Sequence, residues 1–356
     1  MINRRGMLRL GGAASLSVTF ATSCPVFQEP AVGADGLERR EDLDELYDAN
    51  VDEAIRKGLG FLISRQNEDG TFQSKQRGRW VGVVSLAGLS LLSRGVLPGH
   101  GEAGMALRRA GQYVLSQVQP SGFLSAQGRT SHGPMYDHGF GTLFLAELYG
   151  MEEELRVRPK LEKAVELIVR TQNDRGGWRY NPAPEDEADL SVTVSQMMAL
   201  RAARNAGLGV PKETIDKAVD YVRRSQNADG GYMYQLRGGG SRFPLTAAAV
   251  VALYNAGIYD GREIDAAIEY LERNMSNNKR VERNNFYFYA HYYSSQAFWH
   301  LGGDTWDGWY RQLKRGLLGL RNAQGGWFDY NSTEYGTAMA CLILNMPRSV
   351  LPIFQR

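Results

Sequence analysis

Acidic, histidine and tyrosine side chains gather in two short stretches of this 356-residue sequence. The first is Tyr136-Asp137-His138, which lies beside glycines at the start of an apolar run. The second runs from Tyr287 to Tyr293 and places His291 among tyrosines and phenylalanines. A carboxylate beside an imidazole can move protons, and aromatic faces stabilise cations and also stack on sugars. These two stretches are the first candidates for a functional site.

A third carboxylate, Asp189, directly precedes the apolar segment that begins at Leu190. Asp189 and Asp137 each have two interpretations. Either carboxylate can cap the free N–H groups at the start of a helix, or it can face a cavity as a functional group. The four candidate catalytic residues Asp137, His138, Asp189 and His291 come from three different repeats, so the sequence predicts neither a metal site nor a cofactor.

The elements that position these residues are read from an internal repeat. A Gln-Asn-x-x-Gly-x-aromatic pattern recurs with variations, and its aromatic residue recurs at intervals of 51 to 55 residues with one double interval. One degenerate copy is therefore expected inside the long interval, which makes six units. The clearest markers of the repeat are Gln66, Phe72, Gln172, Trp178, Gln226, Tyr232 and Trp327, and Gln117 to Phe123 is a looser copy.

Each unit predicts two helices joined by a glycine-rich turn. The first helix is amphipathic, as in Ile215, Ala218, Val219 and Val222, which follow an i, i+3, i+4, i+7 spacing. The second is apolar all round, as over residues 246–256. Helices with one solvent-exposed face alternate with helices that are buried on all sides. This alternation predicts an all-α fold, an (α/α)6 toroid of six hairpins in which outer helices surround inner ones. The glycine pairs are expected to end the outer helices in a left-handed conformation.

In a toroid the inner helices line a central cavity, so the residues at their starts are expected at its mouth. Alignment of the units places the candidate substrate-binding residues at or near this mouth. They are Trp80, Tyr136, Thr193, Arg242, Tyr287, Tyr289, Tyr292 and Tyr335.

The repeat resembles the QW repeat of squalene–hopene and oxidosqualene cyclases, and it is similar to the beta subunits of protein prenyltransferases. Gln172–Trp178, Gln226–Tyr232 and Asn322–Trp327 carry the resemblance, which covers nearly the whole chain after its N-terminal segment. It implies the α/α toroid, here a single one, and an isoprenoid-type lipid as the ligand. Related toroids also occur in polysaccharide-degrading enzymes.

The chain departs from both families where their chemistry is carried. Asp189-Leu190-Ser191-Val192-Thr193 aligns with the cyclases' Asp-x-Asp-Asp-Thr motif, but Ser191 and Val192 replace two of its acids. The zinc ligands of the prenyltransferases are matched by a histidine alone, and Cys341 is interpreted as a core thiol. The resemblance therefore favours a cyclase-like enzyme or binder over a protein prenyltransferase.

Composition and charge exclude several partners. The formal net charge is +2 and no basic run occurs beyond the N-terminus, so nucleic acid is not expected to bind. No apolar run reaches the roughly 18 residues that a membrane span needs. The two cysteines, Cys24 and Cys341, give no disulfide framework.

The N-terminus has the features of a targeting segment. Asn3-Arg4-Arg5-Gly6-Met7-Leu8-Arg9 resembles the twin-arginine export motif, and residues 1–34 are assigned to a signal. Cleavage after Ala34 and lipidation at Cys24 remain alternatives. Residues 35–50 are a charged lead-in, in which Leu46 and Tyr47 suggest a docking helix, and residues 51–356 are the toroid. A periplasmic or envelope-anchored protein is expected.

Three functions remain open at this point. The first is a protein that binds or transforms an isoprenoid or hopanoid-type lipid in an aromatic cavity, without the cyclase acid motif. The second is a non-catalytic scaffold for a cell-envelope component. The third is a polysaccharide lyase or hydrolase that uses Asp137, Asp189 or Glu334 with His138.

Overall fold

The computed structural model describes residues 46–73, 77, 79–126, 133–152, 155–275 and 286–355. Contacts within the chain divide it into two units, Met1–Glu41 and Asp42–Arg356, and every described residue belongs to the second. The expected signal over residues 1–34 and most of the lead-in over residues 35–50 therefore lie outside the described residues. A copy of the repeat one period after Tyr232 would also fall at the edge of the gap before residue 286.

The described residues form twelve α-helices in alternating outer and inner positions, followed by two short 3-10 helices. The outer helices are α2 (Ala49–Arg65), α4 (Gly101–Ser116), α6 (Val157–Arg170), α8 (Lys212–Arg224), α10 (Arg262–Asn274) and α12 (Gly303–Leu320). The inner helices are α3 (Val81–Leu92), α5 (Pro134–Leu148), α7 (Leu190–Asn205), α9 (Phe243–Asn255), α11 (Tyr287–Leu301) and α13 (Thr333–Leu344).

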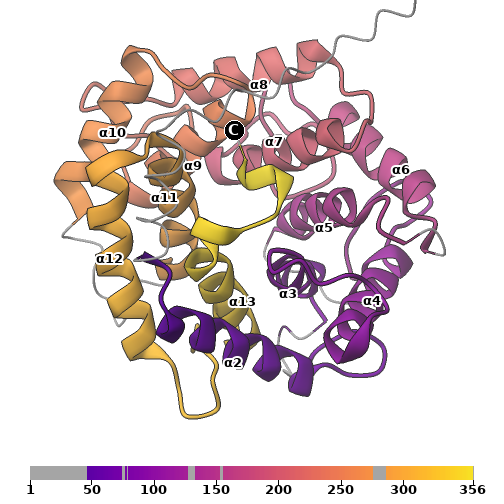
Figure 1. Cartoon of the computed structure of the whole chain (residues 1–356). Coiled ribbons are helices and arrows are strands. Elements are labelled where there is room, and N and C mark those ends of the chain that lie inside the picture. The colour runs from indigo at the N-terminus through magenta and orange to yellow at the C-terminus, as the bar shows by residue number, and fades with distance from the viewer. Residues whose placement is uncertain are drawn as a thin grey trace, which may run out of the picture. The chain divides into compact units, whose positions relative to one another are not determined.

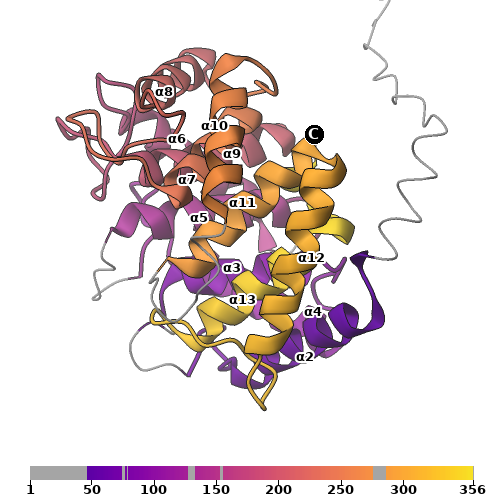
Figure 2. The same ribbon diagram turned by 90° about the vertical axis from the view of Figure 1, so that its left-hand side faces the viewer.

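The inner helices form a closed ring in which each packs against the next, and α13 returns to α3 (Figure 1). All twelve residues of α3 are buried, whereas the outer helix α8 buries only five residues along one face. This difference follows from the sequence, because a helix that is apolar all round needs neighbours on every side. The predicted (α/α)6 toroid is confirmed. Seen from the side, inner helix α11 runs beside outer helix α12 (Figure 2).

The glycines of the repeat do not end the outer helices, so that expectation was wrong. Helix α2 ends at Arg65, and Gly70 lies in the turn that follows, with φ of +83°. A Cβ atom on Gly70 would stand 2.3 Å from the backbone oxygen of Arg109 in the next outer helix. Gly176 and Gly230 have the same conformation and the same close approach. The glycine is required because the turn lies directly against the neighbouring helix.

The repeated glutamine joins its own turn to the next outer helix. Gln172 Nε2 donates to the oxygens of Gly176 and Thr214, both at 2.9 Å. Gln226 bonds Gly230 and Glu263 in the same way, and Gln66 bonds Gly70 and Ala106. One amide group thus satisfies two backbone acceptors and links consecutive units of the ring.

The looser copy of the repeat is shifted by one residue from the sequence alignment. Isolated β-bridges pair Gln66 with Phe72 and Gln226 with Tyr232, and the equivalent bridge in the second unit pairs Val118 with Leu124. The aromatic position is therefore occupied by Leu124, not by Phe123. A buried leucine fills the same site, so the turn is kept although the motif is not.

The C-terminal segment closes one end of the ring (Figure 1). After α13, the 3-10 helices η4 (Met346–Arg348) and η5 (Pro352–Phe354) cross the carboxyl-terminal ends of the inner helices, and the Val350 N–H bonds the Ser93 oxygen at 3.3 Å. Leu351, Ile353 and Phe354 are buried. Among the described residues, this segment covers the end of the ring at which the inner helices finish.

At the start of the described chain, Leu46 and Tyr47 are also buried against the toroid. The Leu46 oxygen accepts a hydrogen bond from Lys314 Nζ at 2.9 Å, and Asp48 caps α2 by accepting from the N–H groups of Asn50 and Val51. The end of the lead-in is therefore part of the folded unit.

Candidate functional site

A cavity of about 680 Å³ lies at the amino-terminal ends of the inner helices. Aromatic side chains from all parts of the ring line it: Trp80, Tyr136, Phe140, Tyr180, Tyr234, Phe286, Tyr289, Tyr330 and Tyr335. The turns that precede the inner helices supply five of these rings, and the first two turns of the inner helices supply the other four. The volume is within the range of about 300–1,000 Å³ that is usual for small-molecule sites.

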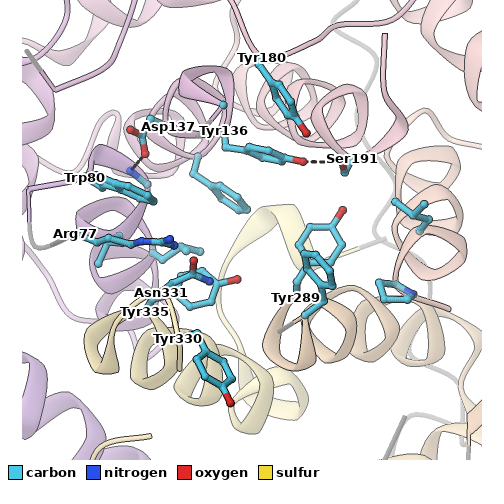
Figure 3. A pocket seen from close by; sticks show the side chains of 18 of the residues that line it. Arg77, Trp80, Tyr136, Asp137, Tyr180, Ser191, Tyr289, Tyr330, Asn331 and Tyr335 are labelled. Atoms are coloured by element: carbon cyan, nitrogen blue, oxygen red, sulfur yellow. Dashed lines mark hydrogen bonds between the residues drawn. The ribbon is translucent and has the colours of Figure 1, made fainter. Parts of the chain in front are cut away.

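A chain of hydrogen bonds connects the cavity wall to a buried carboxylate (Figure 3). The Tyr136 hydroxyl donates to Ser191 Oγ at 2.6 Å, and the Ser191 hydroxyl donates to Asp189 Oδ1 at 2.7 Å. Tyr136 and Ser191 line the cavity, whereas Asp189 is fully buried behind them. The hydroxyl groups of Tyr136 and Ser191 therefore connect the cavity to Asp189.

Asp189 also caps helix α7, because its Oδ1 accepts the N–H of Val192 at 2.9 Å. Burial raises the pKa of this carboxyl above its usual range, although the bonds from Val192 and Ser191, the nearby Arg179 charge and the Tyr234 hydroxyl act in the opposite direction. The capping interpretation is therefore confirmed for Oδ1, and the same oxygen also accepts the hydroxyl of Ser191, which lines the cavity.

Three phenols of the cavity have a raised pKa. Burial raises the pKa of Tyr136, Tyr289 and Tyr335 well above the usual value of 10. Tyr180 and Tyr234 share a hydrogen bond between their hydroxyl groups. This part of the wall is thus made of aromatic rings with a few hydroxyl groups, which suits a largely apolar ligand.

Asp137, in the first turn of α5, also lines the cavity. The N-cap of this helix is Gly133, so Asp137 does not cap its own helix. Its Oδ1 instead accepts the backbone N–H of Gly82, in the first turn of α3, at 2.8 Å. Among the residues that line the cavity, Asp137 alone carries a carboxylate.

His138 and Thr193 point away from the cavity and hold the repeat turns. Thr193 Oγ1 accepts the N–H of Trp178 at 3.1 Å, and His138 Nδ1 accepts the N–H of Leu124 at 3.2 Å. The other His138 nitrogen, Nε2, donates to the Ala164 oxygen at 3.1 Å. Burial lowers the pKa of His138 to about 4, so the ring is neutral. The histidine occupies the place that Thr193, Thr246 and Thr337 take in three other units.

The remaining sequence candidates lie at three different depths. Trp80, Arg242, Tyr289 and Tyr335 line the cavity. Tyr292 lies beneath it, with its ring 6.4 Å from Phe140 and 6.1 Å from Phe354. Tyr287 and His291 pack towards the outer layer, where the His291 ring is 5.3 Å from Trp309 of α12. The structure therefore brings together Trp80, Tyr136, Asp137, Arg242, Tyr289 and Tyr335.

Several lining residues were not expected from the sequence, among them Arg77, Tyr180, Tyr234 and Phe286. The two tyrosines have a signal that could have revealed them. Tyr180 stands two residues after Trp178, and Tyr234 stands two residues after Tyr232. In both of these units the aromatic residue two places after the repeat marker lines the cavity.

The other titratable groups lie apart from the cavity. Glu334 is buried and accepts from Arg65 at 3.3 Å. Burial raises the pKa of the Cys341 thiol to about 12, which leaves it as a packing residue. Within the described part of the chain, no three His, Cys, Asp or Glu side chains are grouped so as to hold a metal ion.

No family model matches the sequence. Solved structures do match the fold. The type II terpene cyclase MstE from Scytonema, in complex with its substrate geranylgeranyl dihydroxybenzoate, matches with a TM-score of 0.58 and 13% identity over 86% of this chain and 98% of that chain. An alpha-mannanase from Bacteroides thetaiotaomicron matches with a TM-score of 0.61 and 10% identity over 87% of this chain and 98% of its own.

The chain therefore has an all-α toroid of the type II terpene cyclase kind. It is also distantly homologous to drimenyl diphosphate synthase from Streptomyces showdoensis, with 26% identity over 181 residues. That match spans 50% of this chain and 32% of the synthase, so it covers about a third of the relative's length.

Proposed function

We propose that the toroid binds an isoprenoid-type lipid in the cavity formed by the inner helices. The observation that carries the proposal is the lining itself, in which nine aromatic rings surround a space that the C-terminal segment closes at its inner end. Apolar ligands gain most from such a site, because they bury surface without leaving polar groups unpaired. The fold match to a terpene cyclase whose solved complex contains a prenylated substrate supports the same ligand class.

We further propose that the site does not protonate its ligand as the cyclases do. The cyclase motif aligned at residues 189–193 would place its second acid at Ser191, and the Ser191 hydroxyl lines the cavity in that position. A hydroxyl group is far too weak an acid to protonate an alkene. Any chemistry at this wall would involve hydrogen bonding through Tyr136, with Asp189 as the buried acceptor at the end of the chain.

A polysaccharide-cleaving function has less support from the geometry. Glycosidases use two carboxylates across the bond that is cleaved. Of the three carboxylates considered, Asp137 lines the cavity, Asp189 is buried behind Ser191, and Glu334 binds Arg65. The match to the mannanase concerns the fold alone. The aromatic lining of the cavity favours a lipid over a polysaccharide. A scaffold function is disfavoured because the cavity is open at one end.

The location remains part of the proposal. We propose that residues 1–34 direct export by the twin-arginine route, that residues 35–50 lead into the toroid, and that the protein acts in the periplasm or at the envelope. None of the described helices is long and apolar enough to cross a membrane.

Lipid capture tests the proposal. The purified protein is incubated with a mixture of prenyl alcohols, squalene and a hopanoid, and the bound lipid is identified by mass spectrometry. We expect an isoprenoid to be retained and to raise the melting temperature. Leu245→Trp fills part of the cavity and should abolish retention, whereas Leu97→Trp, at a side chain that is 55% exposed and outside the cavity, should not. Retention of no lipid would refute the proposal.

A further inference from the structure

Arg77 is a charged residue at the mouth of an otherwise aromatic cavity. It precedes α3, and its guanidinium carbon lies 4.3 Å from the centre of the Trp80 ring. Figure 3 shows Arg77 directed towards Asn331 and Tyr335, which come from the opposite end of the chain. Within the described residues, Arg77 makes no ion pair and no side-chain hydrogen bond. Its five N–H donors are therefore available to a ligand.

The surroundings of Arg77 favour a negative group at the mouth. Arg242, the N-cap of α9, lines the same cavity from a different inner helix. The inner helices all begin at this end, so the partial positive charges of their amino termini are also directed there. The N-cap residues of α9 and α11 make no side-chain cap hydrogen bond, whereas in α3 the Gly82 N–H is bonded by Asp137.

Two carboxylates lie near enough to oppose an anion. Asp329 is buried, and burial raises the pKa of its carboxyl more than the nearby Arg77 charge lowers it. Its Oδ1 accepts the N–H of Asn331 at 2.7 Å, and Asp137 is bonded to the Gly82 N–H. Both carboxylates thus have backbone partners of their own, and neither forms an ion pair with Arg77.

We propose that Arg77, held against Trp80, binds a phosphate-bearing head group of a lipid whose chain occupies the aromatic cavity. The inference rests on the proposed function and adds the polar end of the ligand to it. A guanidinium presents paired N–H donors that match two phosphate oxygens at once. Stacking on the indole fixes the plane of the guanidinium without using any of those donors. Arg242 adds positive charge from the other side of the mouth.

Paired ligands of one chain length separate the head group from the chain. Binding of farnesol and of farnesyl diphosphate is measured by isothermal titration with the full-length protein. We expect farnesyl diphosphate to bind about tenfold more tightly or better, and we expect added salt to reduce this difference. Arg77→Gln should remove most of the advantage and leave farnesol binding within about twofold. Arg77→Lys should restore only part of it, because an ammonium cannot bind two oxygens in one plane.

Arg79→Gln is the matched control. Arg79 lies two residues from Arg77 and its substitution removes the same charge, but its side chain is 59% exposed and paired with Asp69 at 3.1 Å outside the cavity. This variant should bind both ligands as the natural protein does. If neither ligand binds the natural protein, the proposed function itself fails. If both bind equally, or if Arg77→Gln weakens farnesol as much as the diphosphate, the head-group assignment alone is overturned. Equal binding of farnesoic acid would overturn the preference for phosphate.

Discussion

The carboxylate of Glu147, on inner helix α5, accepts a hydrogen bond from the backbone N–H of Ile353 at 3.2 Å. The two residues are 206 positions apart, and their contact joins the inner ring to the segment that closes it. Glu147 is 6% exposed, and burial raises the pKa of its carboxyl to about 7. The closing segment is thus anchored on an acid that titrates near neutrality.

Replacing Glu147 should change the pH dependence of stability. The pKa is raised in the folded protein, so the stabilising effect of the neutral acid is fully present below the unfolded pKa of 4.5 and is lost as the pH rises through about 7. Glu147→Gln keeps an acceptor for Ile353 without the charge. We expect the variant to gain about 2–3 kcal/mol on the natural protein between pH 5 and pH 8.5.

Denaturant unfolding of both proteins at the two pH values measures this difference. His138 titrates in the same experiment, but it is present in both proteins and cancels in the comparison. Parallel pH profiles would show that Glu147 does not titrate as its burial implies.

Gly176→Ala should destabilise the ring strongly. Gly176 has φ of +92°, and a Cβ atom there would stand 2.1 Å from the Lys217 oxygen of α8. The left-handed conformation alone costs about 1–2 kcal/mol for a residue with a Cβ, and the collision with the backbone adds to it, so we expect a loss of about 2 kcal/mol or more. Thermal unfolding measures the loss. Gly209→Ala, where no atom lies within 4 Å, should have little effect, and equal losses in the two variants would contradict the steric explanation.

Trp178→Ala and Trp327→Ala should each lower the free energy of unfolding by about 3–5 kcal/mol. Both indoles are buried, and each Nε1 donates at 2.7 Å to a backbone oxygen of the preceding outer helix, that of Ile168 for Trp178 and that of Leu317 for Trp327. Chemical denaturation measures the change. Trp178→Phe keeps a six-membered ring but loses the Nε1 donor and the rest of the indole, so it should cost about 2–3 kcal/mol, less than the alanine variant. Unchanged stability in both alanine variants would contradict a structural role for the aromatic residue of the repeat.

Tyr136 and Ser191 should be coupled energetically. Ser191→Ala leaves the hydroxyl of the half-buried Tyr136 without the partner at 2.6 Å, which should cost about 1 kcal/mol. Tyr136→Phe and the double variant complete a cycle in which we expect a coupling energy of about 1 kcal/mol. Urea unfolding of the four proteins measures it. Strict additivity would mean that the hydroxyl chain to Asp189 is not formed in solution.

The sequence by itself determined the fold. Recurring glycine-containing turns, three of them with both the glutamine and the aromatic residue, separate amphipathic helices from fully apolar ones. This alternation leaves few ways to bury the apolar faces other than a ring of hairpins. The reason is that the same local pattern recurs along the chain. A departure in one copy, such as the one-residue shift at Leu124, does not change the fold that the other copies predict.

The tertiary structure alone decided which polar side chains meet. Asp189, His138 and Thr193 stand close in sequence to cavity residues, yet they point into the wall because a change of one residue rotates a helical side chain by about 100°. Arg77, Tyr180 and Tyr234 reach the cavity from turns that have no helical period to predict their direction. The closing of the far end by residues 349–355 depends on contacts with helices hundreds of residues earlier, among them that of Ile353 with Glu147. Local sequence patterns contain no information on such distant pairs.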